Sequence, residues 1–238
     1  MSRMRLVLIP GFWLDASSWD DVVPVLTAAG HAVTPMTLPG VESADADRSG
    51  ITLRDHVDAV IGVVDGIDPG EGPVVLVGHS GGGGVAHAVA DARPDRIARV
   101  VYVDSLPLRD GGCINDELPV VGGEIPLPDW SFFEDEDLID LDDDLRAALR
   151  ARAIPMPVRV ASDKQRLSDP RRYEVPVTVI ACEFTAEQVR EWIAGDAPWT
   201  SELAAVRHVE FVDLPTGHWP QFTRPADLGA AIAAAVAR

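Results

Sequence analysis

The chain is 238 residues long, with 47% hydrophobic and 24% charged residues, proportions typical of a globular protein rather than a disordered one. Its formal net charge of −18 at pH 7 repels polyphosphate backbones and anionic membrane surfaces, which argues against nucleic-acid and membrane partners. No segment approaches the roughly 20 apolar residues that cross a bilayer, and the N-terminus lacks the pattern of a signal peptide. We therefore expect a single-domain, cytoplasmic protein.

The cysteines and the acidic residues do not predict a metal centre. Cys113 and Cys182 lie far apart and lack metal-ligand spacing, so we expect two free thiols. Much of the negative charge falls in residues 134–144. We interpret this segment as a solvated face rather than a cation site.

Short apolar runs rich in β-branched residues alternate with segments of helical periodicity, which is typical of βαβ units around a buried sheet. The sequence thus predicts an α/β fold with a mostly parallel sheet flanked by helices. The expected strands cover residues 5–9, 31–36, 74–77, 99–103, 177–181 and 208–212. The expected helices cover residues 17–29, 52–64, 82–92, 186–194 and 227–236.

The alternation stops between residues 106 and 173, where Pro, Gly and acidic residues surround one helical stretch at 141–153. An insertion at this point would lie over the carboxyl ends of the strands, where ligands bind in such sheets. We predict that residues 106–173 form a small cap on a core of residues 1–105 and 174–238, as one structural unit. The apolar side chains of the cap are expected either to line a pocket or to form its own core: Trp130, Phe132, Phe133, Ile154 and Met156.

The clearest catalytic pattern is the turn Gly78-His79-Ser80-Gly81-Gly82, which directly follows an expected strand and precedes an expected helix. In the pattern G-x-S-x-G a sharp strand-to-helix turn exposes the central serine, and small neighbours are a steric requirement. The backbone N–H of Gly81 at the helix start is placed to stabilise a developing oxyanion. We therefore predict that Ser80 is a nucleophile.

Two other interpretations of this glycine-rich turn fit the sequence poorly. A phosphate-binding P-loop ends in Gly-Lys-Ser/Thr, whereas the single lysine of the chain is Lys164. A dinucleotide-binding turn needs G-x-G-x-x-G and a downstream acid, and the run here is irregular and late in the chain. The sequence therefore implies no cofactor.

A serine nucleophile needs a base within hydrogen-bond reach and a further group that orients the base. Among the histidines, His218 follows the expected strand 208–212 in a short loop before the last helix, which places it near the same sheet edge as Ser80. We predict that His218 is the base. His79, adjacent to Ser80, is interpreted as a packing or pocket residue.

Four segments together form a recognisable set: Leu8-Ile9-Pro10-Gly11-Phe12-Trp13, Gly78-His79-Ser80-Gly81-Gly82, Val101-Tyr102-Val103-Asp104-Ser105-Leu106-Pro107 and Gly217-His218-Trp219-Pro220. This set resembles the α/β-hydrolase superfamily over nearly the whole chain, in particular its small esterase and hydroxynitrile-lyase-like branch. The resemblance implies an α/β-hydrolase fold and a serine-based site.

The resemblance also implies an oxyanion hole. In such families the loop after the first core strand often reads His-Gly-x, and residue x donates its backbone N–H. Here Pro10 replaces the histidine, and Phe12 matches x. The resemblance thus implies Phe12 and Gly81 as the oxyanion donors, with substrate-pocket residues nearby: Trp13, His79 and Trp219.

The acid has two candidates. The family's usual acid follows the next-to-last strand in a pattern like Gly-x-x-Asp, but this chain reads Ala181-Cys182-Glu183-Phe184 there. Either Glu183, one position early, or Asp104, at the end of the strand after the nucleophile helix, is able to replace it. Both preserve the chain order serine, acid, histidine, so the sequence leaves the choice open.

Three functional hypotheses follow, each with a small-molecule ligand, and a homodimer is compatible with all of them. The first is a serine hydrolase that cleaves a small carboxylic ester or lactone through an acyl-enzyme. The second is a cofactor-independent lyase of the hydroxynitrile-lyase type, although those enzymes place a lysine where Trp219 follows His218. The third is a catalytically weak ligand receptor on the same fold, because an intact serine and histidine do not prove turnover.

Overall fold

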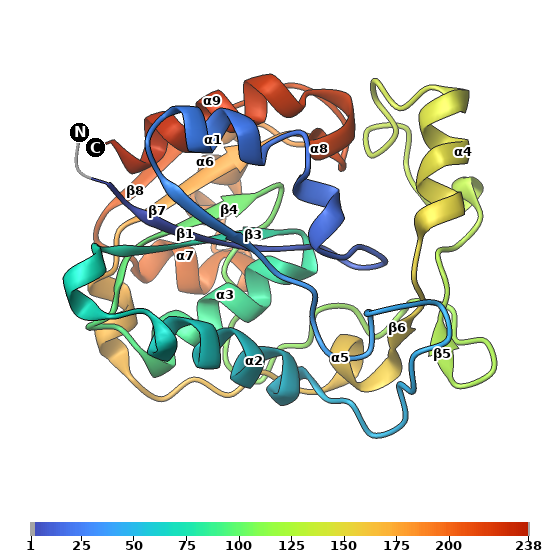
Figure 1. The fold of residues 1–238 in the computed structure, drawn as a ribbon, viewed down its shortest axis with the longest axis horizontal. Helices are drawn as coiled ribbons and strands as arrows, with labels where there is room; N and C mark the ends of the chain where they lie inside the picture. Colours follow the sequence, from blue (N-terminus) through green and yellow to red (C-terminus); the bar gives the residue numbers. More distant parts are fainter. Residues whose placement is uncertain (1–2, 238) are drawn as a thin grey trace.

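The computed structural model describes residues 3–237 and shows a six-stranded parallel sheet flanked by helices (Figure 1). The strands lie side by side in the order β2-β1-β3-β4-β7-β8. Their bounds are β1 Arg5–Ile9, β2 Ala32–Pro35, β3 Val74–His79, β4 Ile97–Val103, β7 Val177–Ala181 and β8 Val209–Asp213. The α/β fold class predicted from the sequence is confirmed.

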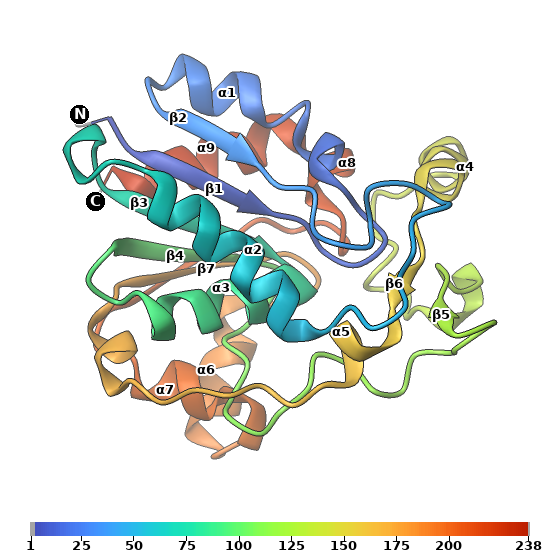
Figure 2. The ribbon, with the colours of Figure 1, turned by 60° about the horizontal axis from the view of Figure 1, so that its bottom comes forward.

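Helices cover both faces of the sheet. On one face α1 packs against α9, and on the other α2 packs against α3 (Figure 2). The helix bounds are α1 Val23–Ala28, α2 Leu53–Gly66, α3 Gly81–Ala92, α4 Asp143–Arg152, α5 Val158–Ser162, α6 Ala186–Ala194, α7 Ser201–Ala205, α8 Pro220–Thr223 and α9 Pro225–Val236.

The expected first helix, residues 17–29, is wrong in its extent. The structure divides this segment into a 3-10 turn at Ala16–Trp19 and a shorter α1 that begins at Val23. Pro24 has no backbone N–H to donate, so it is accommodated in the first turn of a helix but not in its interior. The helix therefore starts again at Val23, with Pro24 in its first turn.

Successive residues of the buried strands point to opposite faces and fill two separate apolar cores. In β1, Leu6 and Leu8 belong to the core beneath α1 and α9, whereas Val7 and Ile9 belong to the core beneath α2 and α3. All four side chains are fully buried. This two-sided packing makes the sheet a rigid platform for the loops at its strand ends.

Residues 106–162 lie mostly beyond the carboxyl ends of the central strands (Figure 1). They carry α4, α5 and a small antiparallel pair of strands, β5 (Glu124–Ile125) and β6 (Met156–Pro157). Residues 163–173 instead run back to the start of β7 (Figure 2), where the 3-10 turn Pro170–Glu174 packs against α3. The division of the chain into this cap and a core of residues 1–105 and 174–238 stays a prediction.

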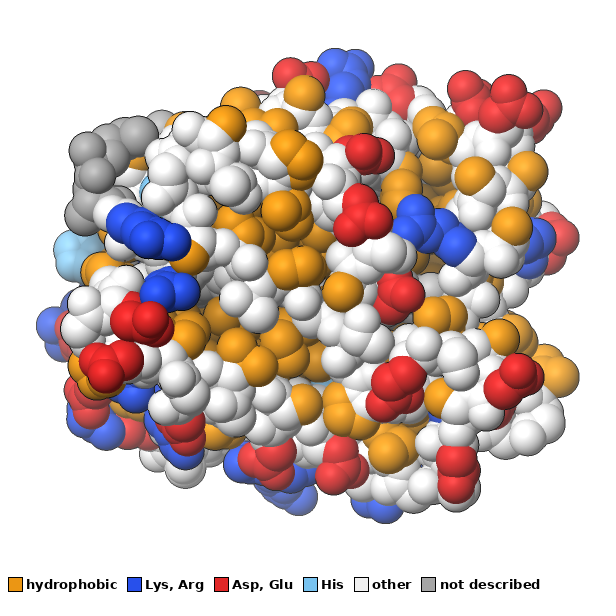
Figure 3. Space-filling model, viewed as in Figure 1, with side chains coloured by type: hydrophobic (Ala, Val, Ile, Leu, Met, Phe, Trp, Pro, Cys, Tyr) orange, Lys and Arg blue, Asp and Glu red, His pale blue; other side chains and the backbone are white. Residues whose placement is uncertain are grey.

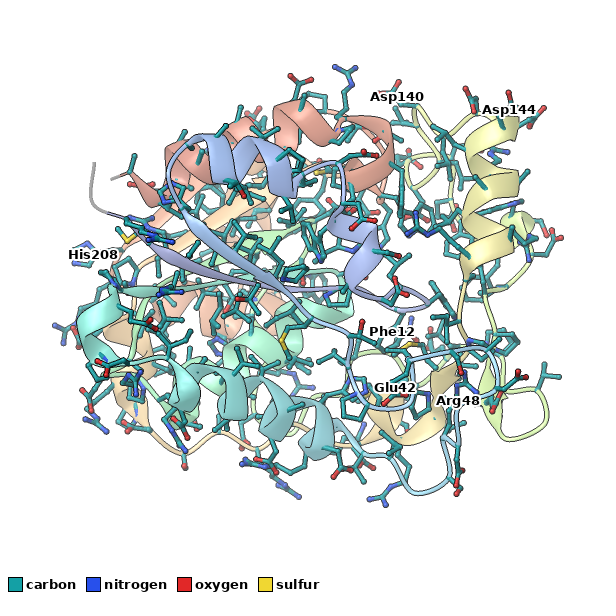
Figure 4. All side chains as sticks on the ribbon, viewed as in Figure 1. Phe12, Glu42, Arg48, Asp140, Asp144 and His208 are labelled. Carbon is teal, nitrogen blue, oxygen red and sulfur yellow. The ribbon has the colours of Figure 1, made fainter. Side chains whose placement is uncertain are left out.

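A buried arginine ties the cap to the core. Arg48, which Figure 4 labels, comes from the loop after β2. Its guanidinium donates to the carbonyl of Pro155 at 2.7 Å and to the carboxylate of Glu124 at 3.0 Å. A second link is the indole N–H of Trp13, which donates to the carbonyl of Ile125 at 3.1 Å.

The acidic segment 134–144 is mostly exposed, as the sequence predicts. Asp140 and Asp144 lie at the outer edge of the molecule on the α4 side (Figure 4), and acidic side chains gather at the same corner of the surface (Figure 3). Among the acidic residues of the segment, Asp137 is the exception, because it is half-buried and faces the site described below. Within residues 3–237, no helix has both the length and the apolarity needed to cross a membrane.

Candidate active site

Ser80 lies on the sharp turn between β3 and α3. Its backbone adopts φ 49° and ψ −125°, a conformation that residues other than glycine rarely adopt. The turn is tight because a Cβ on Gly82 would lie 2.6 Å from the carbonyl oxygens of Ile9 and Pro10. Only glycine lets the helix begin so close to the end of β1.

A continuous chain of hydrogen bonds connects Ser80, His218 and Asp104. The hydroxyl of Ser80 lies 2.8 Å from Nε2 of His218, and Nδ1 of His218 lies 2.8 Å from Oδ2 of Asp104. The other carboxylate oxygen of Asp104 accepts the backbone N–H groups of Cys182 at 2.9 Å and Glu183 at 3.0 Å. The structure thus brings the predicted nucleophile, the predicted base and one candidate acid into one arrangement.

Both candidate acids reach the histidine. Since β4 and β7 are neighbouring parallel strands with Val103 opposite Ile180, the residues that follow them meet at one sheet edge. Oε2 of Glu183 lies 3.0 Å from Nδ1 of His218. The Asp104 side chain is fully buried, whereas 27% of the Glu183 side chain is exposed.

The surroundings of His218 favour its protonated form. Burial disfavours the charged imidazolium, but the carboxylates of Asp104 and Glu183 outweigh it and hold the pKa of His218 well above its usual range. His79 behaves in the opposite way: burial, together with repulsion by His218, lowers the pKa of His79 to about 3. The site therefore contains one basic imidazole and one neutral imidazole.

The two expected oxyanion donors lie side by side. A Cβ on Gly81 would lie 2.7 Å from the ring of Phe12, and both residues line the same cavity as Ser80. Gly81 is the first residue of α3, so its N–H has no acceptor within the helix. A helix N-terminus also carries partial positive charge. The arrangement can stabilise negative charge on an oxygen bound beside Ser80.

A cavity of about 360 Å³ opens in front of Ser80 and His218. This volume lies in the range of small-molecule pockets. Apolar and polar side chains from the core and the cap both line it. The apolar ones are Phe12, Trp13, Leu106, Leu108, Ile114, Leu118, Phe132 and Phe133, and the polar ones are Ser80, Asp104, Ser105, Asn115, Asp137 and His218. Trp13, an expected pocket residue, is among them.

His79 and Trp219, also expected in the pocket, do not line this cavity. Each is only 1% exposed. The ring of His79 turns away from the cavity, because its Nε2–H donates to the carbonyl oxygen of His218 at 2.6 Å. Trp219 packs edge to face against Phe133, with ring centres 5.2 Å apart. Both residues therefore support the wall of the site from behind.

The apolar side chains of the cap divide between the two roles expected for them. Phe132 and Phe133 line the cavity, whereas Ile154 and Met156 are buried in the core. Trp130 packs against Trp219 rather than lining the cavity.

Sequence reasoning missed Asp137 as a site residue. Its side chain lines the cavity, and its backbone carbonyl accepts the N–H of His218 at 2.8 Å. Burial and the hydrogen-bonded carboxyl of Glu183 raise the pKa of Asp137 to about 6. The only sequence signal was a position inside an acidic run, which does not distinguish Asp137 from its exposed neighbours.

A serine on a strained strand-to-helix turn, followed by an acid and a late histidine at the carboxyl edge of a parallel sheet, defines the α/β-hydrolase class. The chain belongs to the alpha/beta hydrolase family, whose model matches residues 6–231.

Individual relatives are esterases by name. The chain is 33% identical over 116 residues to a carbendazim hydrolyzing esterase of Nocardioides sp. (strain SG-4G), and the aligned part covers 48% of this chain and 47% of that protein. It is also 33% identical over 104 residues to methylesterase 7 of Arabidopsis thaliana, and the aligned part covers 43% of this chain and 40% of that protein. The chain thus matches less than half the length of these relatives, which confirm the resemblance to the small esterase branch.

Solved structures resemble the fold along almost its entire length. An extracellular alpha/beta-hydrolase from a Paenibacillus species superposes with a TM-score of 0.76 at 23% identity, over 98% of both chains. A methylesterase from Arabidopsis superposes with a TM-score of 0.78 at 19% identity, over 98% of this chain and 99% of that one. At these identities the two structures support the fold alone.

Proposed function

We propose that the protein is a serine hydrolase that cleaves a small, uncharged carboxylic ester or lactone through an acyl-enzyme. The observation that carries this proposal is the hydrogen-bonded chain from Ser80 through His218 to Asp104, which opens on a cavity with aromatic and aliphatic side chains in its wall. The names of the relatives, an esterase and a methylesterase, point to the same reaction class.

The geometry assigns a role to each group. The Ser80 hydroxyl attacks the ester carbonyl while Nε2 of His218 accepts its proton, and Asp104 holds the ring by accepting Nδ1–H. The backbone N–H groups of Phe12 and Gly81 stabilise the negative oxygen of the tetrahedral intermediate. His218 then gives its proton to the leaving alcohol, which leaves an acyl group on Ser80. A water molecule, deprotonated by His218, attacks this acyl group. The bond between the acyl carbon and Ser80 then breaks, His218 returns the proton to the Ser80 oxygen, and the acid is released.

The charges around the cavity favour an uncharged substrate. Among the described residues that line it there is no lysine or arginine, whereas Asp104 and Asp137 are both present. An anionic acyl group would lose hydration without gaining a cationic partner. An apolar acyl group, by contrast, would replace water against aromatic and aliphatic side chains. The lyase and receptor hypotheses have no comparable observation in their favour.

A panel of p-nitrophenyl esters tests the proposal. We expect the wild type to hydrolyse the acetate and butyrate esters, and to prefer butyrate over the size-matched succinate monoester, which carries a carboxylate. Ser80→Ala should lower kcat by about 10⁴-fold or more. Ser131→Ala, a change at an exposed serine of the cap, should leave kcat unchanged. A wild type that hydrolyses none of these esters, or equal rates in Ser80→Ala, would contradict the proposal.

A further inference from the structure

Asp104 alone has the geometry to orient His218. The imidazole has one Nδ1–H, and Oδ2 of Asp104 accepts it at 2.8 Å. The Asp104 carboxylate is itself immobile, because it is fully buried and its other oxygen accepts the N–H groups of Cys182 and Glu183. A rigid, aligned acceptor is what fixes the tautomer and the tilt of a catalytic histidine.

Glu183 meets the same nitrogen in a different way. Its Oε2 lies 3.0 Å from Nδ1 of His218, yet it accepts no aligned hydrogen bond from any described residue. This oxygen is buried, although the side chain as a whole is partly exposed. This distance lies within hydrogen-bond range, but the single Nδ1–H is directed to Asp104, so the Glu183 carboxylate acts on the imidazole mainly through its charge.

Asp137 extends this second carboxylate toward the cap. Burial and, after it, the neighbouring carboxyl of Glu183 raise the pKa of Asp137, which is the effect expected when two carboxyls share one proton. Oδ2 of Asp137 also accepts the backbone N–H of Glu134 at 2.8 Å, and the carbonyl of Asp137 accepts the N–H of His218. The cap is therefore joined to the histidine loop at the point where the carboxyl pair lies.

The other titratable groups near His218 are uncharged. His79 is held neutral by burial, and its Nε2–H is committed to the carbonyl of His218. Burial, with the nearby carboxylates of Asp104 and Glu183, raises the pKa of the Cys182 thiol well above its usual range. The charge acting on His218 thus comes from Asp104, Glu183 and Asp137.

We propose that Glu183 and Asp137 form a proton-sharing carboxyl pair that sets the pH range in which His218 can accept the proton of Ser80, while Asp104 alone orients the ring. The inference rests on the proposed ester hydrolysis. A carboxylate within about 4 to 6 Å of an imidazole stabilises its charged form by the equivalent of 1 to 3 pH units. The pair therefore raises the pH at which activity appears, because His218 is a base only after it loses its proton.

The pair also makes the two carboxyls respond together to pH. At low pH one proton lies between Asp137 and Glu183, and the pair carries one negative charge. As the pH rises, the pair loses this proton and carries two charges. The second charge stabilises the protonated form of His218 further. Asp137 is thus a positioning residue that acts through Glu183.

The pH dependence of kcat/KM for a p-nitrophenyl ester tests this pair. In Glu183→Gln the rise of kcat/KM with pH should occur about 1 to 3 pH units lower than in the wild type. Well below the midpoint of the wild-type rise, kcat/KM of the variant should therefore exceed that of the wild type by about tenfold or more. Asp137→Asn keeps a hydrogen-bond donor beside Glu183 and removes one charge. The rise of its kcat/KM with pH should therefore move in the same direction by a smaller amount. The exposed controls Glu187→Gln and Asp135→Asn should leave the rise at its wild-type pH.

A nitrogen-15 NMR titration of His218 gives a readout that needs no turnover. We expect the wild-type imidazole to titrate well above 6.5 and the Glu183→Gln imidazole to titrate lower. An unmoved His218 titration in Glu183→Gln, or a wild-type midpoint at or below 6.5, would overturn the inference, and the second result needs no variant. Failure of the proposed function has a different signature: no Ser80-dependent hydrolysis, whatever the titration shows.

Discussion

Replacing Asp104 by asparagine separates the orienting acid from the second carboxylate. The backbone N–H groups of Cys182 and Glu183 both donate to one oxygen of this side chain. An asparagine must therefore keep its carbonyl oxygen toward those two donors and turn its NH₂ group toward His218. Nδ1 then becomes an acceptor, the ring proton moves to Nε2, and Nε2 can no longer accept the proton of Ser80.

The expected loss is large because the wrong tautomer is locked in. The same exchange in a serine protease triad lowers kcat by about 10⁴-fold, which corresponds to about 5.5 kcal/mol of transition-state stabilisation. Steady-state hydrolysis of p-nitrophenyl butyrate by Asp104→Asn measures it, with the exposed Asp227→Asn as the charge-matched control. A loss of less than tenfold would refute the reasoning, because Glu183 would then be able to orient His218 unaided.

Two further predictions concern stability. Burial raises the pKa of Glu202, but its hydrogen bonds with His87 and Arg172 outweigh burial and lower the pKa to about 2. Because this folded-state pKa lies below the ordinary value of 4.5, Glu202 contributes about 3 kcal/mol of stability above pH 4.5 that is lost as the pH falls toward 2. Urea unfolding of Glu202→Gln should show this loss at pH 7, and equal stability of the two proteins would contradict it. Gly82→Ala places a Cβ 2.6 Å from two backbone oxygens, so its unfolding midpoint in the same assay should fall by the equivalent of about 3 kcal/mol or more; an unchanged midpoint would show that the turn relaxes freely.

Local patterns were sufficient to predict the nucleophile and the base as a pair. Ser80 lies where a buried strand runs directly into glycines and a helix, and this pattern is complete within a few residues. His218 follows the last strand, and the carboxyl ends of parallel strands share one edge. Position along the chain therefore predicted their proximity without any tertiary detail.

The sequence could not decide whether Asp104 or Glu183 orients His218, and the strand order of the sheet explains why. Asp104 and Glu183 follow neighbouring strands, so both carboxylates reach the same nitrogen. What distinguishes them is alignment and burial, which depend on the backbone donors that hold Asp104. Strand order and hydrophobic pattern contain no information about these donors.

Side-chain direction and the placement of the cap were also beyond the sequence. His79 is adjacent to Ser80, yet the turn points its ring toward the carbonyl of His218 and away from the cavity. Asp137 reaches the site because the cap backbone pairs with the histidine loop, a contact between segments far apart in the chain. A long-range contact of this kind leaves no periodic trace in the sequence.

The central claim is that Ser80 becomes acylated during turnover. Stoichiometric labelling with a fluorophosphonate, followed by intact-mass and peptide analysis, tests it most directly, because the reagent reacts with activated serine nucleophiles and forms a stable adduct. We expect one adduct per chain on Ser80, loss of ester hydrolysis in proportion to labelling, and no adduct in Ser80→Ala. Labelling at another residue, or hydrolysis that persists in the fully labelled protein, would contradict it.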